Sequence, residues 1–156
     1  MKSDFIPQKD YNLIKFDKQQ KDIIKRVKEY SFRNCRNDIE QSYLTKILNS
    51  FDYGFVYFRT EILKINNVKK IRPCAFACVQ DYGNNTLYLL VICSIYNNDN
   101  LGIKIMNEVI EFAKNNGYIK IILECDEKLI KFYQKFDFID EKIVDDEMHF
   151  MIKNIE

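Results

Sequence analysis

The fold is decided by residues 86–125, TLYLLVICSIYNNDNLGIKIMNEVIEFAKNNGYIKIILEC. Thr86–Ile95 is almost continuously apolar, which is typical of a strand buried on both faces in the middle of a sheet. The spacing i, i+3, i+4, i+7 of an amphipathic helix is then met by Met106, Val109, Ile110 and Ala113. Gly117 ends this helix in the C′ position, and Tyr118–Cys125 is the next strand. A strand, a helix and a strand in this order predict a βαβ unit with parallel strands and a right-handed crossover.

The chain before this unit predicts strands joined by turns. Phe, Tyr and Val gather in short runs, so we expect strands at Tyr11–Phe16, Tyr53–Ile62 and Pro73–Gln80. Asn66-Asn67 is a turn signal, and Asp81–Asn85 reads as the loop of a hairpin.

Two helices are expected between the first two of these strands. Asp17 is a suitable N-cap for the first helix, whose apolar residues recur at helical spacing: Ile23, Ile24, Val27 and Tyr30. Asp38 is the expected cap of the second helix, whose apolar residues are Leu44, Ile47 and Leu48.

The chain after the βαβ unit predicts a short helix and two closing strands. Asp126 opens the helix, which places one apolar face at Leu129, Phe132, Tyr133 and Phe136. The strands are expected at Phe138–Val144 and Met148–Lys153. Antiparallel runs around one parallel crossover give an α/β (mixed α+β) sheet of mixed direction.

The composition excludes several classes of protein. With 156 residues, 47% of them hydrophobic, the chain is long enough to form one domain, residues 1–156, with its own core. A net charge of +1 gives no basic field, so we expect no nucleic-acid partner. No apolar run approaches the ~18 residues of a membrane span, and Met1–Asp10 lacks the apolar region of a signal peptide. We therefore expect a cytoplasmic protein without a membrane partner.

The five cysteines form no CxxC pair, so the sequence predicts reduced thiols and no disulfide framework. Cys74 and Cys78 are expected on the same face of one strand, and two thiols alone make no metal site. We expect no bound metal.

The junction between the apolar strand and the central helix has the composition of a phosphate site. A helix N-terminus offers unpaired N–H groups and a partial charge of about +0.5. The polar loop Asn97–Asn100, together with Gly102, supplies residues that tolerate a positive φ. The motif GxxxxGK[ST] is absent, so the loop favours a ligand positioned through its phosphates over phosphoryl transfer.

At this junction the chain resembles the GCN5-related N-acetyltransferases (GNAT family), whose phosphate motif is Q/R-x-x-G-x-G/A. The matching segment is Asn97–Gly102, in which Gly102 is kept, Asn100 replaces the first glycine and Asn97 replaces Gln or Arg. The segment Phe132–Phe138 is similar to the family's FYxKxGF, with Asp137 in place of the glycine. The last strand, Met148–Lys153, resembles the family's closing strand.

The resemblance implies a twisted mixed sheet of about six or seven strands, with a central βαβ unit and helices on both faces. It implies acetyl-CoA as the co-substrate, with its thioester in a splay between Thr86–Ile95 and Tyr118–Cys125. Pantetheine would pair with backbone at Ile92, Cys93 and Ser94, where the Ile92 amide would polarise the thioester carbonyl. The pyrophosphate would rest on the amides of Asn97, Asn98, Asp99, Asn100, Leu101, Gly102 and Ile103.

The catalytic expectations concern two residues. Tyr133 matches the tyrosine of FYxK, which the family uses as the general acid toward the leaving thiolate. Glu124 lies near the C-terminal end of its strand, where open α/β sheets bind ligands, and would accept the amine's proton or hold the ammonium. Plainer readings stay open, a core tyrosine for Tyr133 and a solvated carboxylate for Glu124. Nothing in the sequence places His149, the only histidine, at the site.

The function expected from the resemblance is N-acetyl transfer to a primary amine by direct attack in a ternary complex. The alternative is a catalytically inactive GNAT-like protein that binds a partner or senses acyl-CoA, because the phosphate motif is only partly kept. The acceptor stays open among an aminosugar, a polyamine, a small antibiotic amine, and the lysine or N-terminus of a protein. The identity of the base and a homodimeric state also stay open.

Overall fold

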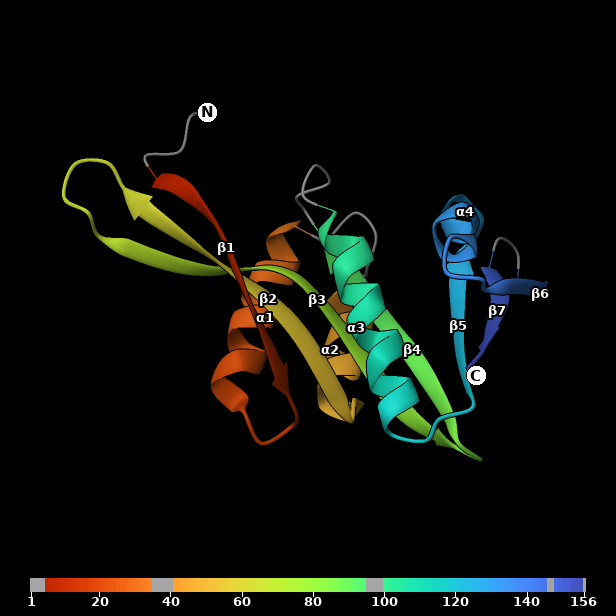
Figure 1. Cartoon of the computed structure of the whole chain (residues 1–156). Coiled ribbons are helices and arrows are strands. Elements are labelled where there is room, and N and C mark those ends of the chain that lie inside the picture. The colour runs from red at the N-terminus through yellow and green to blue at the C-terminus, as the bar shows by residue number, and fades with distance from the viewer. Residues whose placement is uncertain (1–4, 35–40, 95–99, 146–147, 156) are drawn as a thin grey trace.

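The computed structural model describes residues 5–34, 41–94, 100–145 and 148–155. Its described strands form one sheet in the order β1-β2-β3-β4-β5-β7-β6 (Figure 1). The strands are β1 (Phe5–Phe16), β2 (Tyr53–Leu63), β3 (Lys69–Gly83), β4 (Thr86–Ser94), β5 (Lys120–Asp126), β6 (Ile139–Asp145) and β7 (Met148–Asn154). Only β4 and β5 are parallel among these neighbours. The predicted mixed sheet of about six or seven strands with a parallel pair is confirmed, and the described sheet has seven strands.

Helices cover both faces of the sheet, as expected (Figure 1). They are α1 (Lys21–Asn34), α2 (Gln41–Ser50), α3 (Leu101–Asn115) and α4 (Ile130–Gln134), the last preceded by the 3-10 turn Glu127–Leu129. Residues of α3 and α4 share one core cluster with the sheet, and residues of α1 and α2 share the other. Within the described part of the chain, no helix is long and apolar enough to cross a membrane.

The turns take the conformations that their residues predict. Asn84 and Asn85 both have a positive φ, 53° and 58°, and they join β3 to β4 in a two-residue hairpin. Gly117 has a φ of 77° and follows the C-cap of α3.

Several boundaries differ from the sequence expectation. β1 begins at Phe5 and not at Tyr11, because Phe5–Pro7 also pairs with β2. Asp38, the expected cap of the second helix, lies outside the described residues.

Three other differences have a local cause. The Asp17 carboxylate accepts a hydrogen bond from the Gln19 amide at 2.9 Å, which forms a turn, so α1 begins only at Lys21. The Tyr118 amide donates to the Ala113 carbonyl at 3.0 Å, so this residue completes the end of α3 and β5 begins at Lys120. β3 is longer than predicted at both ends because it pairs along β2 as far as Lys69 and with β4 as far as Gly83.

Two expectations about the cysteines are wrong. Cys74 packs in the cluster beneath α3, whereas Cys78 packs in the cluster beneath α1 and α2. The pairing of β3 with β2 is irregular at Cys74, and this β-bulge reverses the alternation of the side chains. Cys93 is disulfide-bonded, so the prediction of reduced thiols fails for it, while Cys74, Cys78 and Cys125 are free.

Candidate active site

The two parallel strands form a fork. β4 pairs with β5 at three positions only, Thr86 with Lys120, Leu87 with Ile121, and Tyr88 with Ile122. Beyond Tyr88 and Ile122 the described residues of the two strands, as far as Ser94 and Asp126, continue without pairing and diverge (Figure 1). The inner edge of β4 beyond Tyr88 therefore has no strand beside it, so its backbone groups are available to an extended ligand.

The start of α3 lies at the open end of this fork. Asn100 is its N-cap, in the left-handed conformation (φ 53°, ψ 33°), which is the conformation expected of a residue that replaces glycine. Its side chain makes no capping hydrogen bond, and the first turn of α3 contains no acidic residue. The amides of this turn are thus left for an anion. Asn97, Asn98 and Asp99 lie outside the described residues.

Gly102 packs α3 against α4. A Cβ atom at Gly102 would lie 3.6 Å from the ring of Phe132, which is ordinary van der Waals contact. Leu101 is buried in the core beneath, and Ile103 packs on the same core. The structure would therefore accept a Cβ atom at this position, and the backbone of Gly102 does not require a positive φ either.

The end of β4 carries the three residues expected to contact pantetheine. Ile92 packs against the core beneath α3, and Cys93 against the core beneath α1 and α2. The buried hydroxyl oxygen of Ser94 has no hydrogen-bond partner among the residues that the structure describes. An unsatisfied buried hydroxyl is costly, so a ligand that hydrogen-bonds it would gain binding energy.

Tyr133 lies in the core on the α3 side of the sheet, 5% exposed, with its ring against Phe132 and Phe138 at centroid distances of 5.1 and 5.8 Å. Burial raises the pKa of its phenol well above the usual value, and Cys125 adds to this. The hydroxyl is therefore protonated at neutral pH and is a hydrogen-bond donor.

Glu124 lies on the opposite face of β5 from its buried neighbour Cys125, as the strand alternation predicts. The negative charge of Glu124 contributes, after burial, to the raised pKa of two tyrosines. Burial and then the Glu124 carboxylate raise the pKa of Tyr43, and the same two causes come first in raising the pKa of Tyr88 to about 12. The structure therefore brings Glu124 together with phenols from α2 and β4.

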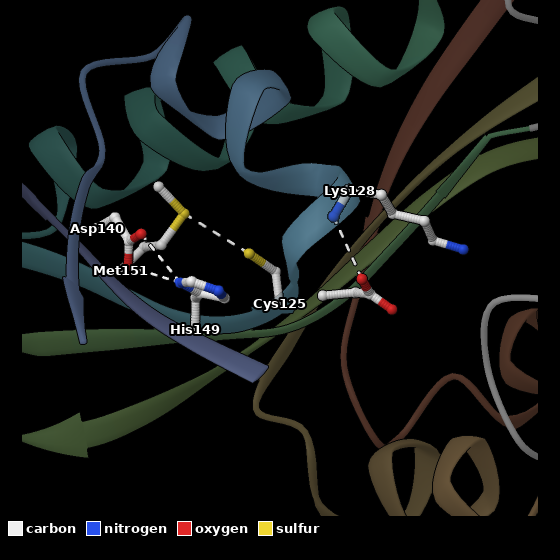
Figure 2. Close-up of polar contacts among 6 residues, drawn as sticks. Cys125, Lys128, Asp140, His149 and Met151 are labelled. Carbon is white, nitrogen blue, oxygen red and sulfur yellow. Dashed lines mark hydrogen bonds and ion pairs between the residues drawn. The ribbon is translucent and has the colours of Figure 1, made fainter. Parts of the chain in front are cut away.

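His149 belongs to a separate cluster on β7 (Figure 2). Its Nδ1 lies 2.9 Å from a carboxylate oxygen of Asp140 on β6. The sulfur of Cys125 is directed to the sulfur of Met151 at 3.6 Å, and burial raises the pKa of this thiol to about 11. A thiol with so high a pKa is a poor nucleophile at neutral pH, so this cluster is best explained as packing between β5, β7 and β6.

The structure of this chain superposes on several solved structures of acetyltransferases. The ribosomal-protein-S18-alanine N-acetyltransferase from Escherichia coli superposes with a TM-score of 0.67 at 13% identity, covering 94% of this chain and 95% of that chain. Tetrahymena GCN5 gives a TM-score of 0.67 at 16% identity, with coverage of 94% and 96%. The PaiA N-acetyltransferase from Thermoplasma acidophilum, solved in complex with coenzyme A, gives 0.57 at 14% identity, with coverage of 93% and 99%.

The chain has the GNAT fold. At 13–16% identity, these likenesses are likenesses of fold. No protein-family model matches the sequence, and no curated protein matches it in sequence.

Within this GNAT fold, the sequence analysis missed Tyr43 and Tyr88. One signal for Tyr88 was present, because a parallel register that pairs it with Ile122 puts it on the same face as Glu124. No sequence signal places Tyr43, because its position depends on how α2 packs on the sheet. Among the described residues, no group of three or more His, Cys, Asp or Glu side chains is arranged to hold a metal.

Proposed function

We propose that the chain is an N-acetyltransferase that moves an acetyl group from acetyl-CoA to a primary amine of a small molecule or peptide. The observation that carries this proposal is the fork, in which two parallel strands diverge after Tyr88 and Ile122 while a helix N-terminus lies at the open end. The function is assigned to one domain formed by residues 1–156.

The residues present fit acetyl-CoA. The free inner edge of β4 at Ile92, Cys93 and Ser94 would pair with the amides of pantetheine, and the orphaned Ser94 hydroxyl would gain a partner. The first-turn amides of α3, from Leu101 to Ile103, would hold the pyrophosphate together with Asn97, Asn98, Asp99 and Asn100. The Asn100 conformation and the absence of acidic residues in this turn support an anion here.

The chemistry is the replacement of a thioester by an amide. Acetyl-CoA supplies an acyl carbon with a good leaving group. The lone pair of the neutral amine forms the C–N bond, the C–S bond breaks, and its electron pair leaves with the thiolate. One proton leaves the nitrogen and one proton is taken up by the sulfur. An amide N–H of β4 at Ile92 would stabilise the negative charge that develops on the carbonyl oxygen.

Two side chains serve the proton movements. Glu124, an exposed carboxylate beside the fork, accepts the amine's proton directly or through water. Tyr133 offers a protonated phenol to the departing thiolate. Because burial raises the pKa of this phenol, full proton transfer to a thiol with a pKa near 8.5 is unfavourable. Tyr133 is therefore best assigned as a hydrogen-bond donor to the leaving thiolate, which then takes its proton from solvent.

The proposal is tested by mass-spectrometric detection of acetyl transfer to a panel of amines, using the wild-type protein and Glu124→Gln. We expect transfer with at least one amine, and a loss of about 100-fold or more in turnover for Glu124→Gln, the usual contribution of a general base. Lys120→Gln, on the paired part of β5, is the matched control. Binding of acetyl-CoA without transfer to any amine would favour the inactive, acyl-CoA-sensing alternative instead.

A further inference from the structure

Tyr88 lies at the base of the fork. It is the last residue of β4 that pairs with β5, and Glu124 follows its partner Ile122 by two residues. Residues two apart on a strand point to the same face, so the ring of Tyr88 and the carboxylate of Glu124 both face the side covered by α1 and α2. Tyr133 lies on the opposite side, in the core beneath α3. The two faces of the fork thus differ in chemistry.

Tyr43 approaches the same place from α2. Its hydroxyl makes a long hydrogen bond of 3.5 Å to the carbonyl oxygen of Leu90, which lies two residues beyond Tyr88 on the diverging part of β4. The Tyr43 side chain is 47% exposed, so one part of it contacts the fork and another part faces solvent. The register of β4 and β5 puts Glu124 on the same face as Tyr88. The pKa values of Tyr43 and Tyr88, raised first by burial and then by the Glu124 charge, agree with this placement.

A third ring extends this surface. Tyr82 of β3 lies 5.5 Å from Tyr88 between ring centroids and is 62% exposed. Glu124 forms no ion pair with a cation of the described residues. The base of the fork on this side therefore combines tyrosine rings with a carboxylate that no described residue neutralises.

Aromatic faces beside a free carboxylate bind organic cations. The ring quadrupole attracts an ammonium group over its face, and the carboxylate adds a full negative charge. We propose that Tyr43, Tyr88 and Glu124 form the binding site for the acceptor's ammonium group, so that the substrate is a cationic alkylamine. This assignment rests on the proposed acetyltransferase function for its catalytic meaning, but the cation site itself is present without acetyl-CoA.

The site has a consequence for the substrate class. An alkylammonium held here lies beside the point where the two strands separate, and its proton is presented to Glu124. An acceptor with an anionic group next to its amine, such as a phosphorylated aminosugar, would meet the Glu124 carboxylate and be repelled. The site therefore disfavours amines that carry negative charge near the reacting nitrogen.

The test uses tetramethylammonium, a cation that cannot be acetylated, and tert-butanol, an uncharged molecule of similar shape. Binding is followed by ligand-observed NMR without acetyl-CoA, for wild type, Tyr43→Phe, Tyr43→Leu, Tyr88→Leu and Glu124→Gln. Tyr53→Leu is the matched control, because Tyr53 is similarly exposed, at 40%, but its ring packs on Phe112 of α3. Each variant is first checked for cooperative unfolding.

We expect tetramethylammonium, but not tert-butanol, to bind wild type, Tyr43→Phe and Tyr53→Leu alike. Tyr43→Leu and Glu124→Gln should each weaken binding roughly ten-fold, the effect of losing one cation–π or charge contact at a partly desolvated site. Tyr43 is on the helix surface, so its leucine variant keeps the test valid even if Tyr88→Leu does not fold. Equal binding of both probes, no binding by wild type, or equal binding by Tyr43→Leu and Tyr53→Leu overturns the cation site.

A separate readout distinguishes this failure from failure of the acetyltransferase function. Stabilisation of the wild-type protein by acetyl-CoA reports on the start of α3 and on the end of β4 at Ile92, Cys93 and Ser94, where Tyr43 is not part of the proposed contacts. If acetyl-CoA stabilises the protein but tetramethylammonium does not bind, the cation site is wrong and the acyl-CoA site stands. If tetramethylammonium binds as expected and acetyl-CoA does not, the cation site stands and the acetyltransferase function fails.

Discussion

Tyr133 is the residue whose environment most constrains its role. It is 5% exposed, and burial raises the pKa of its phenol, so the hydroxyl stays protonated in the apoprotein. A buried donor that meets a developing thiolate makes a charge-assisted hydrogen bond. Under the proposed function, this bond would strengthen as the C–S bond breaks and so stabilise the transition state more than the bound substrate.

The first prediction is that Tyr133→Phe lowers turnover about 10- to 100-fold, the effect of removing one hydrogen bond to a charged group. The ring contacts with Phe132 and Phe138 are kept, so the fold and the acetyl-CoA dissociation constant should change little. Steady-state kinetics and isothermal titration with acetyl-CoA measure the two effects separately. Unchanged turnover would remove Tyr133 from the mechanism.

The second prediction concerns Gly102 of α3, which lies beside the ring of Phe132 of α4. A Cβ atom would be 3.6 Å from the Phe132 ring, so Gly102→Ala should bind acetyl-CoA with nearly wild-type affinity. Gly102→Val adds two methyl groups that must displace the ring, and with it α4, and should weaken acetyl-CoA binding about ten-fold or more. Titration of acetyl-CoA into both variants measures this difference. Equal affinities of the alanine and valine variants for acetyl-CoA would show that the space at Gly102 does not affect the proposed pyrophosphate site at the start of α3.

At the scale of the element, the start of α3 depends on one left-handed residue. Asn100 has a φ of 53° and ψ of 33°, and its amide side chain makes no capping hydrogen bond. The residue is therefore required for its backbone conformation, which asparagine and glycine adopt more easily than other residues.

The third prediction follows from this conformation. Asn100→Gly should keep the free energy of unfolding at or slightly above the wild-type value. No side-chain hydrogen bond is lost, and glycine adopts the left-handed conformation at a lower cost than asparagine. Asn100→Val should lower it by about 1–2 kcal/mol, the cost of placing a branched residue there. Urea unfolding of both variants measures the difference. If Asn100→Val proves as stable as Asn100→Gly, residue 100 does not adopt the left-handed conformation described here.

The extent to which elements could be predicted depends on whether their signals are local. The spacing of Met106, Val109 and Ile110, the turn at Asn84-Asn85 and the stop at Gly117 are local, and the structure confirms them. The start of α1 depends on a competing turn that Asp17 closes. The bulge at Cys74 depends on the pairing with β2, so the alternation rule fails there.

At the scale of the whole molecule, several phenols titrate at higher pH in the folded protein than in the unfolded chain. Burial, followed by Glu124, raises the pKa of Tyr88 to about 12, and burial with Asp81 raises that of Tyr118 to about 12. An unfolded tyrosine has a pKa near 10. Above pH 10 the unfolded chain therefore loses protons that the folded chain still holds, and the free energy of unfolding falls.

The fourth prediction is that these tyrosines contribute full stability below about pH 9 and lose it as the pH rises from about 10 to about 12. Urea midpoints at pH 8, 10 and 11 measure the decline. Tyr88→Phe should be less sensitive to pH than wild type over this range, since its ring cannot ionise, while Tyr82→Phe, at an exposed ring, is the control. An identical decline in wild type and Tyr88→Phe would exclude this cause.

Some features of the candidate site could be predicted from the sequence and others could not, again according to whether their signals are local. The parallel strands, the helix start and the face of Glu124 follow from periodicity and order along the chain. The number of residues over which β4 and β5 pair does not follow from the sequence. It depends on the direction that β5 takes when it pairs with β7. The approach of Tyr43 to Leu90 joins residues 47 positions apart in the sequence, and only the packing of α2 brings them together.

The central claim is that the fork between β4 and β5 binds acetyl-CoA. A thermal-unfolding scan with and without acetyl-CoA, with a free adenine nucleotide as the control, tests it most directly. A ligand at about 100 times its dissociation constant stabilises the native state by about 2.7 kcal/mol, which shifts the midpoint of a domain of this size by several degrees. We expect this shift with acetyl-CoA and a much smaller one with the nucleotide. No shift with millimolar acetyl-CoA would contradict the account and favour a GNAT-shaped binding protein that has lost its acyl-CoA site.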